Sequence, residues 1–197
     1  MNALEKGRIK TVLKYTWPFY IVSGIVIALV LNVIFKVSHP VPAYQTLTLF
    51  VTGEVTNRKG FNDYLLKKFV DKKLRTVTCI EATTNDTNYN TKLSVAGYNT
   101  ADILIIPSTK LDNIVVSSFG LELSEEIYAS YQTYKQDNIN YGIKIDNDIV
   151  KDYMSIESQD CYMILNAKSA NIGKYSYDQN IDHDIALTLI KEWGKNV

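Results

Sequence analysis

Residues that form metal sites and disulfide scaffolds are scarce in this sequence, and that scarcity removes several classes of protein. Only two cysteines and two histidines occur in 197 residues, and the GxSxG, HExxH, P-loop and CxxC motifs are absent. No cluster has metal-ligand spacing, and no nucleophile–base set is visible. We therefore expect no catalytic residue, no metal and no cofactor, and an enzyme is the least expected function.

An excess of positive charge is also missing. Lys and Arg number 21, as do Asp and Glu, so the formal net charge is +0. Five of the basic residues and one of the acidic residues lie within the first 37 positions, which leaves the rest of the chain with an acidic excess of four. Nucleic-acid-binding domains carry a basic patch or stripe, so we expect no nucleic-acid partner.

The sequence does contain one long apolar run at residues 17–37, WPFYIVSGIVIALVLNVIFKV. Asp, Glu and Arg are absent from it, and its one lysine, Lys36, lies at the end, where the stem can reach the interface. About 20 residues are needed to cross the roughly 30 Å hydrocarbon core of a bilayer as a helix. The run predicts a transmembrane helix, preceded by a basic cytoplasmic tail at 1–16 and followed by an extended, proline-containing stalk at 38–45.

The charges before the apolar run predict its orientation. Lys6, Arg8, Lys10 and Lys14 outnumber Glu5, and short basic flanks stay on the cytoplasmic side. We expect a single-pass protein of the cell membrane, with a cytoplasmic N-terminus and an extracellular domain at 46–197. A cleaved signal peptide is the alternative, with small residues at 41–43, although its apolar region is normally only about 7–15 residues long.

Hydrophobic periodicity in the outer part predicts alternating strands and helices. Strands are expected at 46–52, 77–82 and 101–106, with a helix at 60–74 and a short helical piece at 92–98 between them. This order is typical of a doubly wound α/β domain with a parallel sheet. Beyond it, helices are expected at 124–134 and 182–193, and strands at 142–146 and 161–166.

Three stretches resemble the extracellular solute-binding proteins of ABC importers. They are TLTLFVTGEVTNRKGFNDYLLKKF at 46–69, ADILIIPSTKLDN at 101–113, and YMILNAKSAN at 162–171 together with ALTLIKEW at 186–193. The resemblance covers 46–193 in patches and implies a periplasmic-binding-protein-like lobe. Members of that family are usually two-lobed and longer, whereas the outer part of this chain has room for about one lobe.

A ligand site is predicted at the carboxyl ends of the strands, where ligands collect in open α/β sheets. The residues selected by this rule are Thr52, Gly53 and Glu54 after the first strand, Thr83 and Thr84 after the second, and Ser108 and Thr109 after the third. Their hydroxyls and the neighbouring helix N-termini suit a small polar or anionic group. Ordinary turn and capping chemistry explains the same residue types without a ligand.

The two cysteines, Cys79 and Cys161, both lie in the outer part, and each sits within an apolar, strand-like run. A disulfide between them is allowed outside the cell. A pair of buried free thiols fits the same positions equally well. The sequence leaves both interpretations open.

Three further features have two interpretations each. His183 lies between Asp182 and Asp184, which suits a metal ligand or, more simply, carboxylates at a helix start. The basic stretch at 67–75 suits an anionic lipid or wall polymer, or an ordinary solvated helix face. Tyrosines gathered at 128–141 suit a platform for a sugar or a protein, or half-buried packing.

Two functional hypotheses follow. The first is a membrane-anchored solute-binding-like domain that binds or senses a small solute, or docks on a membrane transporter. The second is a degenerate lobe without a ligand that serves as a structural or interaction module in a cell-envelope complex. A cleft lined by Glu54, Thr84 and Ser108 would favour the first, and a flat apolar patch in its place would favour the second.

Overall fold

A computed structural model describes residues 3–38, 41–173 and 182–197, and the side chains of 14–35, 41–173 and 182–197. The chain divides into two compact units, Met1–Pro40 and Val41–Val197. Each unit is described by itself below.

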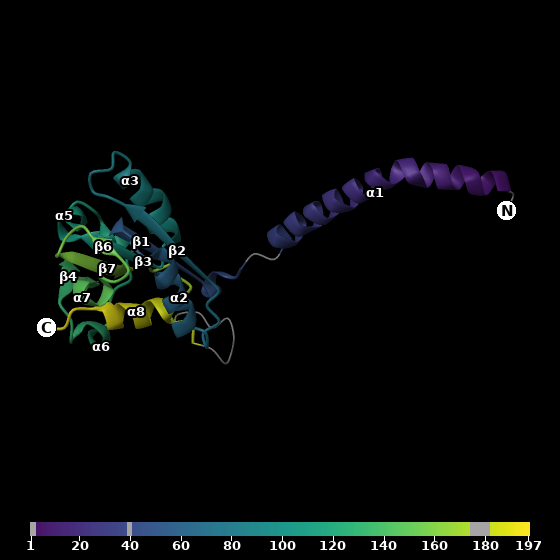
Figure 1. Cartoon of the computed structure of the whole chain (residues 1–197). Helices are drawn as coiled ribbons and strands as arrows, with labels where there is room; N and C mark the ends of the chain where they lie inside the picture. Colours follow the sequence, from purple (N-terminus) through teal and green to yellow (C-terminus); the bar gives the residue numbers. More distant parts are fainter. Residues whose placement is uncertain (1–2, 39–40, 174–181) are drawn as a thin grey trace. The chain divides into compact units, whose positions relative to one another are not determined.

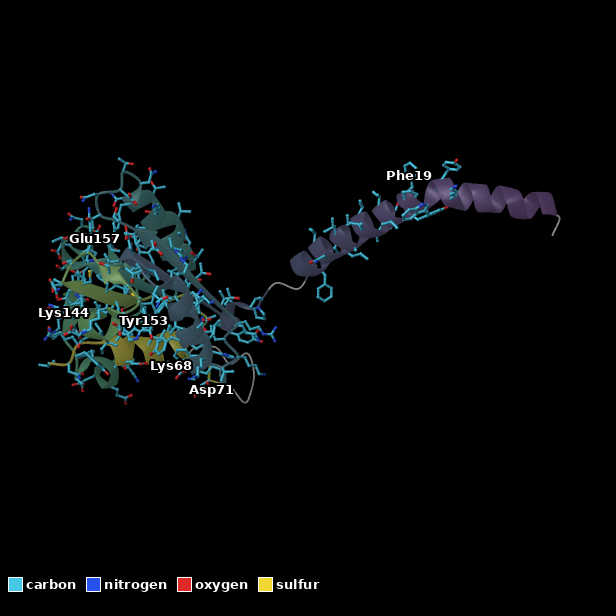
Figure 2. All side chains as sticks on the ribbon, viewed as in Figure 1. Phe19, Lys68, Asp71, Lys144, Tyr153 and Glu157 are labelled. Carbon is cyan, nitrogen blue, oxygen red and sulfur yellow. The ribbon has the colours of Figure 1, made fainter. Side chains whose placement is uncertain are left out.

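The first unit contains the helix α1 (Ala3–Ser38), so the predicted helix is confirmed and the basic residues before it are helical as well. Within α1, the segment Lys14–Phe35 has a mean hydropathy of 2.3, and none of it is buried. Figure 2 shows its side chains, including Phe19, projecting away from the helix axis. A helix of this length and composition near the N-terminus is suited to be a membrane anchor or a signal sequence.

The second unit is built on a mixed sheet of seven strands. These are β1 (Thr46–Glu54), β2 (Thr76–Ala82), β3 (Ile103–Pro107), β4 (Thr133–Gln136), β5 (Ile139–Lys144), β6 (Ser155–Ile156) and β7 (Cys161–Leu165). Their order is β2-β1-β3-β7-β5-β4, and the short β6 pairs with β1. β1 runs parallel to β2 and to β3, as the sequence predicts, whereas every other pairing is antiparallel.

Short helices and two longer ones connect the strands. They are η1 (Ala43–Gln45), α2 (Arg58–Lys68), α3 (Tyr89–Lys92), the π-helical turn η2 (Leu93–Gly97), α4 (Tyr98–Thr100), α5 (Ser108–Leu111), η3 (Val116–Ser118), α6 (Glu125–Tyr128), α7 (Asn147–Val150) and α8 (Ile185–Trp193). The helices α2 and α8 lie on one side of the sheet and α3 lies on the other (Figure 1).

The central strands have apolar side chains on both faces, so each face has its own core. On β1, Leu49 and Val51 pack with the α2 side, while Phe50 packs with Leu93 of η2 on the other. All five residues of β3 are buried, as its unbroken apolar sequence predicts for a strand covered on both faces. This two-sided burial explains the alternation of helices above and below the first three strands.

The amphipathic helix α2 is confirmed and begins at a specific cap. The side chain of Asn57 accepts a hydrogen bond from the Gly60 N–H at 3.0 Å, which satisfies one of the donors left free at a helix start. Phe61 and Leu65 are buried on its inner face. Lys68, at its end, forms an ion pair with Glu192 of α8, so the two helices that cover this face are joined.

Several predictions differ from the structure. The helix expected at 60–74 ends at Lys68, because residues 69–73 form turns and Lys73 has a left-handed φ of +56°. The helix expected at 124–134 is limited to the single turn of α6, because Tyr131 bridges to Asn196 and β4 begins at Thr133. The sheet is mixed rather than parallel, because β7 runs antiparallel to β3. Residues 41–45 belong to the compact unit instead of a stalk: Gln45 is buried, and its carbonyl accepts the Arg75 N–H at 2.8 Å.

Candidate functional site

The three parallel strands bring the predicted site residues to one edge of the sheet. Thr52 pairs with Ala82, which directly precedes Thr83, and Val51 pairs with Ile105, two residues before the end of β3. The carboxyl ends of β1, β2 and β3 are therefore neighbours, with β1 in the middle. The expectation that these ends converge is correct.

That edge is covered by the chain itself. Residues 155–160, here termed the closing segment, run across it between α7 and β7. Glu54 pairs with Ser155 and Gly53 pairs with Ile156 in an antiparallel bridge, and the Glu157 N–H donates to the Thr52 carbonyl at 3.3 Å. A small polar ligand at the end of β1 would have to displace this backbone pairing.

The closing segment also contacts the ends of β2 and β3. The Thr84 N–H donates to both carboxylate oxygens of Glu157, at 2.9 and 3.2 Å. The Ser108 N–H donates to the Asp160 carbonyl at 2.9 Å. Glu157 thus supplies a carboxylate where the sequence predicts an anionic ligand, and each of the three strand ends has a partner from this segment.

A charge pair holds the far end of the closing segment. The Asp160 carboxylate lies 2.7 Å from Nζ of Lys144 on β5. The hydrogen bonds from Lys144 and Ser108 hold the pKa of Asp160 below its usual value of 3.8. Both side chains are partly exposed, so this pair orients the segment more than it stabilises the fold.

The remaining predicted site residues have structural roles. The Thr52 hydroxyl is fully buried and lies 3.0 Å from the Tyr89 hydroxyl. The Thr83 carbonyl accepts the Asp86 N–H in a turn, and the Thr109 carbonyl accepts a side-chain N–H of Asn113. Turn and capping chemistry therefore accounts for these positions, apart from the exposed side chain of Glu54.

The sequence analysis missed the closing segment. Its residues, SIESQD, have neither apolar alternation nor turn motifs, so nothing local marks them as a strand. The signal that could have found it is Gly53. This residue has φ +142°, and a Cβ added there would lie 2.2 Å from the Ser155 carbonyl oxygen. Glycine inside a strand indicates close approach of another backbone.

The cysteines are free thiols, so the disulfide interpretation is wrong. Cys79 lies on β2 and Cys161 on β7, and β1 and β3 separate these strands. Three strand spacings amount to about 14 Å, far beyond the Cα separation that a disulfide allows. Burial raises the pKa of Cys79 to about 11 and that of Cys161 to about 12, so neither thiol is reactive near neutral pH.

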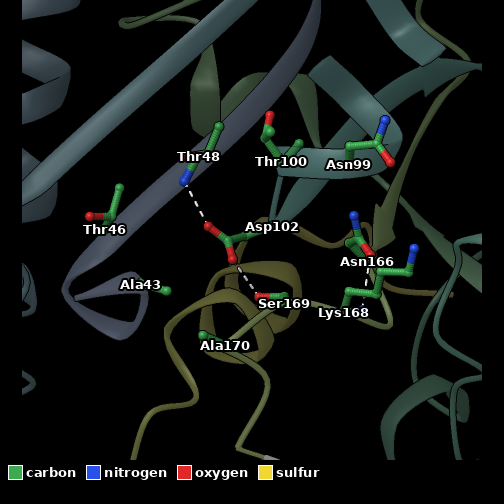
Figure 3. A pocket seen from close by; sticks show the side chains of 11 residues that line it. Ala43, Thr46, Thr48, Asn99, Thr100, Asp102, Asn166, Lys168, Ser169 and Ala170 are labelled. Carbon is green, nitrogen blue, oxygen red and sulfur yellow. Dashed lines mark hydrogen bonds between the residues drawn. The ribbon is translucent and has the colours of Figure 1, made fainter. Parts of the chain in front are cut away.

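A polar cavity lies at the opposite, amino end of the strands (Figure 3). Its volume is ≈ 280 Å³, and its lining includes Thr48, Asp102, Asn166, Lys168 and Ser169. Asp102 is only 7% exposed. A buried carboxylate needs hydrogen bonds to compensate for its lost hydration, so its partners decide what it does.

Asp102 is fully engaged in holding the fold together. Its carboxylate accepts hydrogen bonds from the Thr48 N–H at 2.7 Å, from the Ser169 hydroxyl, and from the Asn171 side chain at 3.3 Å. The Asn171 side chain also donates to the Thr46 carbonyl at 2.8 Å. These contacts join the stretches ADILIIP and NAKSAN to the start of β1.

His183 is placed as a packed core residue. It is 1% exposed, and its ring centroid lies 4.4 Å from that of Tyr44. Its neighbour Asp184 forms an ion pair with Lys72. Across the described residues, no group of three His, Cys, Asp or Glu side chains is arranged to hold a metal ion. The second histidine, His39, lies outside the described residues.

Part of the basic stretch and two of the tyrosines are engaged within the fold. Lys68 and Lys72 form ion pairs with Glu192 and Asp184 of the α8 region, while Lys67 and Arg75 are exposed, as on an ordinary solvated surface. The Tyr131 hydroxyl donates to the Lys191 carbonyl at 2.9 Å. Tyr141, close to these residues in sequence, is 3% exposed. The packing interpretation fits these residues better than a binding platform.

No protein-family model, no curated protein and no solved structure matches this chain.

Replacing Gly53 by alanine should release the closing segment. The added Cβ would clash with the Ser155 carbonyl, and the φ of +142° disfavours any side chain, at a cost of about 1–3 kcal/mol. Hydrogen exchange of the full chain in lipid nanodiscs should show the protection of the Glu157 amide falling by about 10- to 100-fold.

The matched control is Gly24→Ala, where an added Cβ meets no atom within 4 Å. Its exchange in the outer domain should equal that of the wild type. If the Gly53→Ala variant loses as much amide protection in β3 as at Glu157, the substitution destabilises the whole sheet and not the closing segment alone.

Replacing Asp102 by asparagine should change the pH dependence of stability. Burial raises the pKa of Asp102 above 3.8, although its three hydrogen bonds act in the opposite direction. The folded state therefore binds this proton more tightly than the unfolded state. The contribution of this proton to the free energy of unfolding is fully present below pH 3.8. It is lost as pH rises through the raised pKa of Asp102.

Asparagine cannot titrate, and its amide N–H₂ would face other donors, at a cost of about 1–3 kcal/mol at neutral pH. Urea unfolding at a series of pH values should therefore show the wild type gaining stability relative to Asp102→Asn as pH falls from about 7 to 4. If the free energies of unfolding of the wild type and of Asp102→Asn, plotted against pH, stay parallel over this range, Asp102 does not titrate as described.

Proposed function

We propose that this protein is anchored in the cell membrane by α1, and that its outer domain is a single solute-binding-like lobe that acts as an interaction module in the cell envelope. The length and exposure of the apolar segment Lys14–Phe35 support the anchor. Exposed apolar side chains on all sides of an isolated helix are costly in water and favourable in lipid (Figure 2).

The orientation follows from charge. Lys6, Arg8, Lys10 and Lys14 precede or begin the apolar segment, with Glu5 as the one acidic residue among them. Since basic flanks are retained in the cytoplasm, the N-terminus lies inside and residues 41–197 lie outside the cell.

Kinship with one lobe of a solute-binding protein is supported by the order of the strands. The parallel trio β2-β1-β3, with α2 on one face and α3 on the other, is a doubly wound arrangement. The β4–β5 hairpin occupies the stretch where a second lobe would begin, and it extends the same sheet. A clamshell that closes on a solute needs two lobes, and this outer domain has one sheet.

The observation that carries the proposal is the closing segment. At the strand ends, where a solute would bind, backbone groups are hydrogen-bonded to residues 155–160. The carboxylate of Glu157 lies there as well. Solute binding at Glu54, Thr84 and Ser108, or docking on a transporter in a solute-loaded state, would first have to remove these contacts. A lobe whose crevice is filled from within is better suited to contact another protein than to capture a solute.

The orientation can be tested with a protease on intact cells. We expect external protease to degrade residues 41–197 and to spare an epitope at the N-terminus. Neutralising Lys6, Arg8 and Lys10 to glutamine should reduce the fraction of chains in this orientation. If the polypeptide that contains residues 41–197 lacks the N-terminal epitope before protease is added, α1 is instead a cleaved signal sequence.

The interaction function can be tested by native mass spectrometry of the full chain, extracted from its host membrane in nanodiscs. We expect the chain to retain a second envelope protein in fixed stoichiometry and no small molecule whose binding depends on Glu54, Thr84 or Ser108. A variant with alanine at Glu54, Thr84 and Ser108 should behave identically. A small-molecule adduct that the triple variant loses would overturn the proposal in favour of solute binding at the strand ends.

A further inference from the structure

A second cavity lies on the α3 face of the outer domain. It borders the closed edge, because the Tyr89 hydroxyl contacts Thr52 and Lys110 follows Thr109 in α5, but its lining contains none of the predicted strand-end residues. Its volume is ≈ 340 Å³, and it lies between the α3–η2–α4 stretch and α5. The residues around it are Tyr89, Asn90, Leu93, Ser94, Tyr98, Lys110, Asn113 and Ile114. This volume is at the lower end of the range for small-molecule sites.

The charge in this cavity is one-sided. Lys110 is the one charged residue in its lining, and none of the lining residues is acidic. Its Nζ lies 5.2 Å from the centroid of the Tyr89 ring, a distance at which a cation is attracted to an aromatic face. In the part of the chain that the structure describes, Lys110 forms no ion pair.

The walls of the cavity are held by packing. Tyr98 stacks on Phe119, with ring centroids 4.1 Å apart and planes 17° from parallel. The Tyr89 hydroxyl lies 3.0 Å from the hydroxyl of Thr52, so this ring is fixed to β1. A Cβ added at Gly97 would come within 3.2 Å of Leu104, which shows how closely η2 lies on the sheet.

The turn that forms one wall is unusual in itself. η2 is a π-helical turn, and such turns are rare and occur frequently at functional sites. It contributes Leu93 and Ser94 to the cavity and leads directly into Tyr98. Tyr89, Leu93, Tyr98 and Ile114 share the lining with the polar Asn90, Ser94 and Asn113 and with the single cation Lys110. This mixture suits an organic anion that carries an aromatic or apolar group.

We propose that this cavity binds a small carboxylate that carries an aromatic or apolar group, with the carboxylate against Lys110 and the group against Tyr98, Leu93 and Ile114. The site is distinct from the strand-end crevice, so it goes beyond the interaction function and stands without it. Lys110 supplies the charge-assisted contact, and Tyr89 positions Lys110.

The test uses the full chain in lipid nanodiscs, with empty nanodiscs as the blank, and saturation-transfer NMR titrations of three probes. Phenylacetate has both the carboxylate and the ring, phenylacetamide has the ring without the charge, and acetate has the charge without the ring. We expect phenylacetate to bind saturably with a Kd of about 1 mM or tighter. The other two probes should bind about tenfold more weakly or not at all.

Variants locate the binding. Lys110→Met should weaken phenylacetate binding by about tenfold or more, while Lys110→Arg, which keeps the charge, should retain it within about threefold. The matched control is Lys67→Met on α2, an exposed lysine on the opposite face of the sheet, which should leave the Kd unchanged.

Three results would overturn the proposal. They are no saturable binding of phenylacetate up to about 10 mM, equal affinity for phenylacetate and phenylacetamide, and equal affinity of the wild type and Lys110→Met. None of these results depends on whether the chain retains a partner protein, so failure here is distinguishable from failure of the interaction function.

Discussion

The placement of β7 is the constraint on which the rest of the unit Val41–Val197 depends. β7 runs antiparallel beside β3, whereas β1, β2 and β3 run parallel to one another. Its two flanks therefore emerge at opposite ends of the parallel strands, with residues 155–160 at the carboxyl ends and 166–171 at the amino ends. Backbone groups at buried strand ends must be paired. One antiparallel strand supplies the partners at both ends of the sheet.

The two ends are secured by different physical means. Asp102, at the amino ends, is buried, and a buried carboxylate is tolerated only because three donors compensate its lost hydration. Glu157, at the carboxyl ends, is exposed, where a charged contact contributes about 1 kcal/mol or less. The closing segment is therefore held mainly by backbone pairing to Gly53 and Thr52, while the network of Asp102 specifies one arrangement of the 166–171 segment.

Local sequence pattern predicted the first three strands, α2, β5, β7 and α8, but missed β4 and β6 and did not give all strand directions. The apolar repeats of β1, α2 and β3 depend on neighbouring residues, and those elements are found as expected. A five-residue apolar run such as β7 does not indicate whether the strand is parallel or antiparallel to its neighbours. The mixed sheet was therefore not predictable from it. The convergence of Thr52, Thr84 and Ser108 was predictable, because it follows from parallel strands. The segment that covers these residues was not, because it lies about 50 to 100 positions away in the sequence.

The two faces of the domain differ in what they leave for other molecules. Above α2 and α8, the cations Lys68 and Lys72 are already paired with Glu192 and Asp184. On the α3 face, Lys110 lies over the ring of Tyr89, and no acidic residue lines the cavity that it enters. With the carboxyl ends of β1, β2 and β3 paired to residues 155–160, the cavity beside Lys110 is lined by the helices that cover the sheet and not by the strand ends.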